Sequence, residues 1–298
     1  MNALKPFAVE PGVRPEAAVE VRREARLRTP LVFASPHSGR IYPEALHAAS
    51  CLDAHELRRS EDAFVDELIE GALERGAAVV LCRYARAFVD VNRDPWELDP
   101  AMFEDELPDA TRRQSPRVAA GLGAIPRLVA EGREIYSRKL AFSEASERIE
   151  AVHRPYHAAL GELLQEARER FGAAILIDWH SMPSAVARSE TRLGRMRPDV
   201  VLGDRHGAAC AKAVSSFVRR AFEAAGYVTA ANAPYAGGWT TQTWGRPREG
   251  LHALQIELDR GLYLDEEQVQ PSAGLPRLKR DLERLTEKLA AENWAARL

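Results

Sequence analysis

The sequence has few cysteines, and they form no recognisable pattern. Its 298 residues include three, Cys51, Cys82 and Cys210, which lie far apart along the chain. An odd number at this spacing favours neither a disulfide framework nor a cysteine-based zinc knuckle. A reducing compartment is therefore expected, and the protein is predicted to be cytoplasmic.

Long apolar runs and a strong charge of either sign are also lacking. No stretch approaches the roughly 20 apolar residues of a membrane-spanning helix. The opening residues, MNALKPFAVEPGVRPE, lack the apolar core of a signal peptide. Lys and Arg number 41 and Asp and Glu 44, for a formal net charge of −3. This balance argues against nucleic-acid and membrane partners and allows a small anionic substrate. The oligomeric state is not determined by the sequence.

Short apolar runs alternate with helical patterns along most of the chain. Strands are predicted at 31–35, 77–84, 86–92, 173–178, 199–204 and 251–258. Helices are predicted at 60–76, 153–172 and 207–226, and at the C-terminus, where Leu278, Leu282, Leu285 and Leu289 form one apolar stripe. Residues 94–128 and 232–250 are expected to be irregular. This alternation predicts a single α/β domain, with a mostly parallel or mixed sheet flanked by helices.

The domain is expected to span residues 29–298. Residues 1–28 are polar and are interpreted as an N-terminal lead-in segment.

Two histidines follow predicted strands, His37 in LVFASPHSG and His180 in AAILIDWHSMP. In sheets of this kind, ligands bind outside the carboxyl ends of the strands. A catalytic zinc site usually has three His or carboxylate ligands and one open position. The third ligand is expected from the start of the 60–76 helix, as Asp62 or Glu61. Asp178 would share a face with His180 if that strand continued, and could orient the histidine or replace Asp62.

His153 and His157 form a rival metal pair. They are four residues apart and share a face of the predicted 153–172 helix. No third ligand lies near them in the sequence, so the pair at the strand ends is favoured.

Glu257 lies near the end of the apolar strand LHALQIEL. A buried acid must be paired, hydrogen-bonded or functional, because unpaired burial is costly. Glu257 is therefore a candidate general base for a metal-activated water, and a salt bridge to Arg260 is the structural alternative. Asp90, in AFVDVN, has no predicted turn beside it and is interpreted as a structural hydrogen-bonding residue.

Asn92 is the last residue of the predicted strand 86–92, and Arg93 follows it. Arginine suits bidentate binding of a carboxylate. Arg93 with Asn92 is therefore predicted to bind a carboxylate-bearing substrate, and Arg86 is a weaker second candidate.

Several motifs in one order resemble the N-formylglutamate amidohydrolase family. They are SPHSG, ED-x-F-VDEL, R-x-F-VDVNRDP, RPYH, LIDWHSMPS, GDRHG-x-x-C, PYAGG and H-A-LQIELDR, between about residues 30 and 264. The resemblance implies an α/β fold of the phosphorylase/hydrolase type, related to zinc carboxypeptidases and aspartoacylases. It also implies hydrolysis of N-formyl-L-glutamate to formate and L-glutamate, a late step of one route of histidine degradation.

Carried over by residue, the resemblance makes His37, Asp62 and His180 the ligands of Zn²⁺ or another divalent metal. Glu257 takes the place of the general base. Asn92 and Arg93 resemble the pair that holds the substrate carboxylate.

The chain departs from the family in its late loop. Members closer to the characterised enzymes tend to carry GG-Y-I-T-R, whereas this chain has GGWTTQ, with Gln242 in place of the arginine. An arginine there could bind a second carboxylate. This departure keeps one alternative open, the hydrolysis of another N-acyl amino acid or small amide. A second alternative, of a different class, is a non-catalytic binding protein on the same fold.

Overall fold

The computed structural model describes residues 18–129, 132–194 and 196–298. These residues form two compact units of one α/β domain. The first consists of residues 18–20, His37–Glu61 and Cys82–His157, and the second of Val21–Pro36, Asp62–Leu81 and Ala158–Leu298. Residues 1–17 of the predicted lead-in lie outside the described residues. The boundary predicted at residue 29 stays a prediction, and a strand precedes it.

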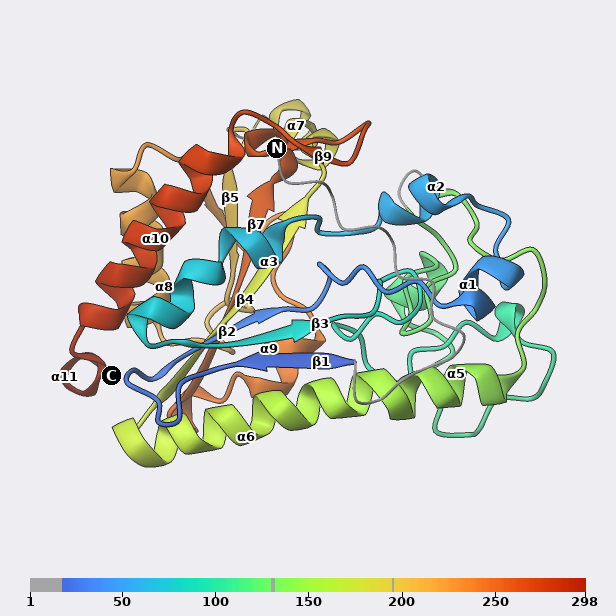
Figure 1. Cartoon of the computed structure of the whole chain (residues 1–298), viewed down its shortest axis with the longest axis horizontal. Coiled ribbons are helices and arrows are strands. Elements are labelled where there is room, and N and C mark those ends of the chain that lie inside the picture. The colour runs from blue at the N-terminus through green and yellow to red at the C-terminus, as the bar shows by residue number, and fades with distance from the viewer. Residues whose placement is uncertain (1–17, 130–131, 195) are drawn as a thin grey trace. The chain divides into compact units, whose positions relative to one another are not determined.

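A seven-stranded sheet organises the second unit (Figure 1), in the order β1-β3-β2-β4-β7-β5-β6. The strands are β1 (Val19–Arg22), β2 (Leu31–Ser35), β3 (Ala78–Cys82), β4 (Ala174–Met182), β5 (Val200–Gly203), β6 (Thr229–Ala231) and β7 (Leu251–Asp259). β2 is parallel to β3 and β4, and β4 is parallel to β7. β5 is antiparallel to β7 and parallel to β6. The predicted α/β class with a mixed sheet is confirmed.

One face of this sheet is apolar and is covered by α3 (Val65–Leu68), α8 (Lys212–Ala224) and α10 (Leu275–Ala291) (Figure 1). Alternate side chains of β4 and β7 point into this core: Ile175, Ile177, Trp179, Leu254, Ile256 and Leu258. The predicted leucine stripe of α10 is buried here. Each fully buried leucine contributes roughly 1.5–3 kcal/mol, so this face anchors the sheet.

The opposite face carries the intervening residues of β4 and β7. Asp178 and His180 on β4 lie directly beside Gln255 and Glu257 on β7. The short helix α9 (Trp239–Trp244) contacts both strands. Polar side chains are thus concentrated on the face that lacks the main apolar core, near the carboxyl ends of two central strands.

The first unit is built from short elements and irregular segments. They are α1 (Glu44–Ala49), α2 (Ala54–Arg58), η3 (Pro100–Met102), α4 (Pro116–Ala119), α5 (Phe142–Arg148) and the π turn η5 (Ile149–His153). The chain continues from η5 directly into α6 (Arg154–Phe171). Apart from η3 and α4, the irregular character predicted for 94–128 is confirmed.

The remaining elements of the second unit are short. They are η2 (Glu70–Arg75), α7 (Ser184–Arg192), η6 (Pro247–Glu249), η7 (Arg260–Leu262), β8 (Leu264–Asp265), β9 (Gln270–Pro271) and α11 (Trp294–Arg297).

Three predicted elements are wrong in part. Residues 86–92 form no strand but a turn, in which Phe88 and Val89 donate backbone hydrogen bonds to Ala85. The helix predicted at 60–76 is reduced to α3 and η2, because Phe64 has a left-handed backbone with φ 64°. The helix predicted at 207–226 begins only at Lys212, since residues 205–207 all have positive φ.

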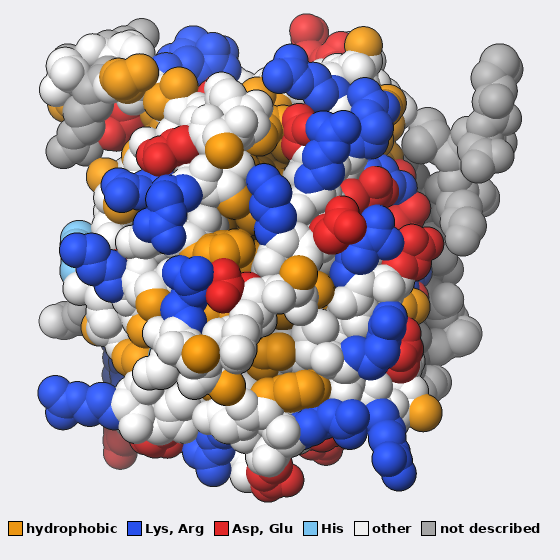
Figure 2. Space-filling view, turned by 90° about the vertical axis from the view of Figure 1, so that its left-hand side faces the viewer, with side chains coloured by type: hydrophobic (Ala, Val, Ile, Leu, Met, Phe, Trp, Pro, Cys, Tyr) orange, Lys and Arg blue, Asp and Glu red, His pale blue; other side chains and the backbone are white. Residues whose placement is uncertain are grey.

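Two further findings concern the surface and the helix lengths. Basic, acidic and apolar side chains are intermixed on the face shown in Figure 2. Within the described ranges, no helix has both the length and the apolar character that a membrane crossing requires.

Candidate metal centre and active site

Asp62 and His180 meet in the second unit as a buried pair. His180 does not follow a strand, as predicted, but lies within β4, which continues to Met182. Its Nδ1 is 3.2 Å from Oδ2 of Asp62. Two ligand atoms bound at about 2.0–2.1 Å to one tetrahedral ion lie about 3.3 Å apart. The observed separation therefore suits two ligands of a single metal ion.

Asp178 lies on the other side of the same imidazole. Its Oδ2 is 3.1 Å from Nε2 of His180, and the buried carboxylate has no other hydrogen-bond partner among the described residues. The continuing strand confirms the prediction that Asp178 and His180 share a face. Burial by itself lowers the pKa of His180, but Asp178 and Asp62 raise it well above its ordinary value. A carboxylate on the second nitrogen is the usual way to orient a metal-binding histidine.

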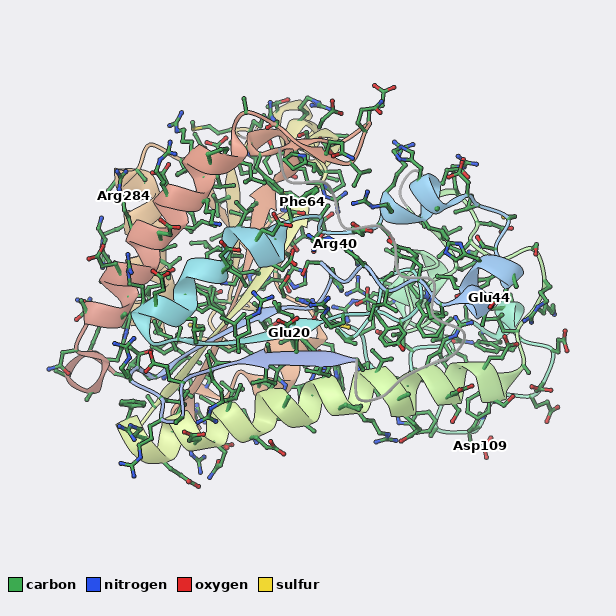
Figure 3. All side chains as sticks on the ribbon, viewed as in Figure 1. Glu20, Arg40, Glu44, Phe64, Asp109 and Arg284 are labelled. Atoms are coloured by element: carbon green, nitrogen blue, oxygen red, sulfur yellow. The ribbon has the colours of Figure 1, made fainter. Side chains whose placement is uncertain are left out.

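Asp62 is itself held in place by Arg260 and Ser181. Arg260 Nη2 donates to Asp62 Oδ1 at 3.0 Å, and Ser181 Oγ donates to the same oxygen at 3.2 Å. Oδ2 is left to face His180. Two residues after Asp62, the bulky residue Phe64, labelled in Figure 3, has a left-handed backbone conformation. Such a conformation costs about 1–3 kcal/mol and occurs mainly where the local structure serves a site.

Glu257 is placed directly beside His180. The two residues are register partners on the parallel strands β7 and β4. Gln255 Nε2 donates to Glu257 Oε1 at 2.8 Å, and the backbone N–H of Gly238 donates to Gln255 Oε1 at 2.8 Å. The late loop thus fixes one oxygen of Glu257 through the amide of Gln255.

Glu61, in the first unit, is hydrogen-bonded by Tyr42 and Arg58. Tyr42 donates its hydroxyl to Glu61 Oε1 at 2.6 Å, and Arg58 binds both carboxylate oxygens at 3.1 and 3.3 Å. Burial raises the pKa of Glu61 in spite of these partners. Its oxygens are engaged, so it competes poorly with Asp62 as a metal ligand.

His37 in the first unit is oriented by Asp90. The two side chains are buried, and His37 Nε2 lies 2.7 Å from Asp90 Oδ1. Burial alone would raise the pKa of Asp90, but His37, Arg93 and Arg86 hold it well below its ordinary value. The prediction that Asp90 is a hydrogen-bonding residue agrees with this contact. The prediction that no turn lies beside Asp90 was wrong, because residues 86–88 and 91–92 form turns.

The predicted carboxylate clamp lies around the same aspartate. Arg86 Nε donates to Asp90 Oδ2 at 3.0 Å, and the backbone N–H of Asn92 donates to Oδ1 at 2.9 Å. Arg93 donates to the backbone oxygens of Leu122 and Asn92, both at 2.9 Å. Arg93 follows a turn rather than a strand, because 86–92 is not extended. The arginines are fixed by backbone and carboxylate acceptors, so they can present a positive charge in a set position.

His153 and His157 are not arranged as a metal pair. Their Nε2 atoms are each 2.8 Å from a backbone oxygen, that of Arg93 for His153 and that of Val91 for His157. Among the described residues, the group that could hold a metal ion consists of His37, Asp62 and His180 and includes neither of these histidines.

Sequence reasoning missed Gln255 and the contact of Arg260 with Asp62. Gln255 alternates with Glu257 on the polar side of an apolar strand, a pattern that could have indicated it. The contact of Arg260 with Asp62 joins residues 198 positions apart, which no local pattern reveals.

Comparison with known proteins identifies the family of this chain. Residues 29–264 match the family model described as N-formylglutamate amidohydrolase. The chain is 31% identical over 242 residues to an N-formylglutamate deformylase of Pseudomonas putida, covering 80% of this chain and 83% of the relative. It is 32% identical over 252 residues to that of Pseudomonas aeruginosa, covering 83% and 87%.

Two solved structures share the fold. The crystal structure of N-formylglutamate amidohydrolase from Ralstonia eutropha JMP134 aligns with a TM-score of 0.86 at 34% identity, covering 94% of this chain and 99% of that one. The gene product Atu2144 from Agrobacterium tumefaciens aligns with a TM-score of 0.66 at 19% identity, covering 92% and 95%, which concerns the fold alone. From the family match and these relatives, the chain belongs to the N-formylglutamate amidohydrolase family.

Proposed function

We propose that this protein hydrolyses the N-formyl amide of an acidic amino acid, converting N-formyl-L-glutamate and water to formate and L-glutamate. The observation that carries the proposal is the pairing of Asp62 with His180, with Glu257 beside them on the adjacent strand. The relatives named as N-formylglutamate deformylases support the choice of substrate.

A divalent metal, with zinc as the first choice, is proposed to bind His37, Asp62 and His180. All three are buried, and each offers one ligand atom of a type that zinc accepts. Both histidines have a carboxylate at one ring nitrogen, Asp90 for His37 and Asp178 for His180. Two imidazoles, each oriented by its own carboxylate, are typical of a metal centre.

Chain connectivity supports the inclusion of His37. It follows Ser35, the last residue of β2, by two positions. β2 runs parallel to β4, with Ala34 opposite Asp178. Both strands therefore have their carboxyl ends on the same side of the sheet, and His180 lies near the carboxyl end of β4. Because Nε2 of His37 is used by Asp90, we assign Nδ1 as its ligand atom.

When bound, such a metal polarises the formyl carbonyl and acidifies a water molecule. Glu257 accepts the proton of the attacking water and passes it to the nitrogen of the leaving amino acid. Gln255 donates to Oε1 of Glu257 and so holds the carboxylate in a fixed orientation for this transfer. Transfer through one carboxylate avoids the release of an amide anion, which is a very poor leaving group.

Arg93 and Asn92, with Arg86 in support, are proposed to bind the substrate carboxylate. Burial lowers the pKa of Arg93, although it remains a cation at neutral pH. Anchoring the carboxylate fixes the formyl group for attack, so that binding energy replaces part of the entropic cost of the reaction.

Gln242, which stands in place of the arginine expected from the family motif, favours a second candidate substrate class. Gln242 is exposed in α9 and carries no charge with which to bind a second carboxylate. A broader range of N-acyl amino acids is therefore the alternative substrate class. We further propose that the enzyme is cytoplasmic and acts in histidine degradation. The assignment to this pathway depends on glutamate being the product.

His180→Ala tests the proposal. The variant should lose bound metal and formate release together, whereas Glu287→Gln, on the exposed side of α10, should lose neither. An active His180→Ala enzyme would refute the metal assignment.

A further inference from the structure

One helical face contacts the backbone of residues 88–93. The contacts are Arg148 Nη1 to the oxygen of Phe88 at 3.3 Å, His157 Nε2 to that of Val91 at 2.8 Å and His153 Nε2 to that of Arg93 at 2.8 Å. We call Arg148, His153 and His157 the carbonyl brace. All six residues belong to the first unit.

The contacts fix the direction of the two histidine hydrogen bonds. A carbonyl oxygen has no proton to give, so each imidazole must donate from Nε2. His153 is buried, and this burial lowers its pKa, which favours the neutral ring. Neutral His153 is then the tautomer with its proton on Nε2.

The backbone oxygens of residues 88–93 need such partners. This segment forms no strand and no helix, so its acceptors are not satisfied by regular secondary structure. Its amide groups bond elsewhere, for example Asp90 N–H to the oxygen of Ala124 at 2.8 Å. The brace therefore supplies hydrogen-bond donors to three of these backbone oxygens, those of Phe88, Val91 and Arg93.

The π turn is what brings the brace together. In an α-helix, Arg148 and His153 would lie about 140° apart around the axis, because five residues advance by about 500°. The turn η5, Ile149–His153, is closed by i→i+5 hydrogen bonds, which widen the turn and bring residues five apart closer to one face. His153, the last residue of η5, and His157 in α6 are four residues apart and therefore lie on one side of the continuous helix. π turns of this kind occur often at functional sites.

The braced segment carries the side chains of the proposed site. Asp90 accepts from His37, and the carbonyls of Val91 and Arg93 flank Asn92. A displacement of these carbonyls would therefore move the carboxylate clamp and the partner of His37 together.

We propose that His153 and His157, with Arg148, are positioning residues that fix Asn92 and Arg93 for binding the carboxylate of the substrate. The inference rests on the proposed function and extends it to the RPYH segment. The brace acts through the backbone and does not touch the reacting atoms.

The experiment compares two replacements at each histidine, with kinetics on two substrates. His157→Leu and His153→Leu remove the donor, whereas His157→Gln and His153→Gln keep an N–H₂ donor at a similar reach. Gln165→Leu, at an exposed position of α6, is the matched control. The substrates are N-formyl-L-glutamate and its diamide, which has no carboxylate. Hydrogen–deuterium exchange of residues 86–97 reports the brace without any need for activity.

The leucine variants should raise KM for N-formyl-L-glutamate roughly tenfold, as expected for the loss of one hydrogen bond to a buried carbonyl. KM for the diamide should not change, exchange in 86–97 should rise, and the glutamine variants should restore the wild-type values. An unchanged KM in both leucine variants would overturn the inference, even if exchange rose. An equal rise in KM for both substrates would also overturn it, because the effect would then be general.

Failure of the proposed function would look different. A wild-type protein that binds N-formyl-L-glutamate in calorimetry but releases no formate would refute the reaction. The Kd of the leucine variants would then replace KM in the same comparison. A wild-type protein that neither binds nor hydrolyses this compound would overturn both.

Discussion

The substitution Glu257→Gln separates the general base from the rest of the site. It removes the basic oxygen but conserves the size of the side chain. The amide oxygen of the new glutamine can still accept the hydrogen bond that Gln255 now donates to Glu257 at 2.8 Å. One such bond is worth about 0.5–1.5 kcal/mol. Because the variant can keep this bond, its free energy of unfolding should change by less than that amount. His180 and Asp62 keep their own contacts.

The chemical step should respond far more strongly. A positioned general base contributes about 10²–10⁴-fold to the rate. At about 1.36 kcal/mol for each factor of ten, this corresponds to roughly 2.7–5.5 kcal/mol of barrier. We therefore expect kcat to fall by about 10²–10⁴-fold, with KM changed by only a few-fold.

The assay is formate release at saturating substrate, with metal content and Tm measured on the same samples. Glu287→Gln, an exposed change of the same kind on α10, is the control. A Glu257→Gln enzyme that retained near-wild-type kcat would refute the general-base role. A variant that had lost its metal would show instead that Glu257 supports the metal centre.

Other outcomes follow from the same contacts. Asp178→Asn should weaken metal binding by about 10–100-fold, measured by competition with a chelator, and excess metal should restore much of the activity; unchanged affinity would contradict its orienting role. Glu61→Gln should leave metal stoichiometry unchanged, since Glu61 is bound to Tyr42 and Arg58; lost metal would make Glu61 a ligand. Gln242→Arg should raise kcat/KM for N-formyl-L-glutamate relative to N-formyl-L-glutamine by up to about tenfold, and no change would place the second carboxylate elsewhere. In metal-free protein, the raised pKa of His180 gives stability that is present below its ordinary pKa of 6.5 and lost as the pH rises through the folded value. Thermal melts from pH 6 upward should therefore show a falling Tm after chelation, and a flat profile would contradict the charged His180.

The sequence predicted the parts of the fold that depend on local pattern. Strands β2, β4 and β7 are short apolar runs bounded by turn residues, and the leucine stripe of α10 repeats with the helical period. Side-chain alternation in β7 correctly separated Glu257 from the apolar residues of the same strand.

The failures have a common physical cause, which is long-range support of irregular backbone. The sequence pattern of residues 86–92 predicted a strand, but the carbonyl oxygens of Phe88 and Val91 are bound by Arg148 and His157, which lie 60 and 66 positions away. The left-handed conformation of Phe64 cannot be expected from its residue type, and it shortens the predicted helix. For the same reason the sequence could not show that Arg260 holds Asp62.

The central claim, metal-dependent deformylation, is tested most directly by formate release from N-formyl-L-glutamate. Purified protein would be assayed after zinc loading, after chelation, and after zinc is restored to the chelated sample. The account predicts release that is lost on chelation and recovered with zinc. Release that is unaffected by complete removal of metal would contradict it, as would the absence of release from folded protein with one metal ion bound per chain.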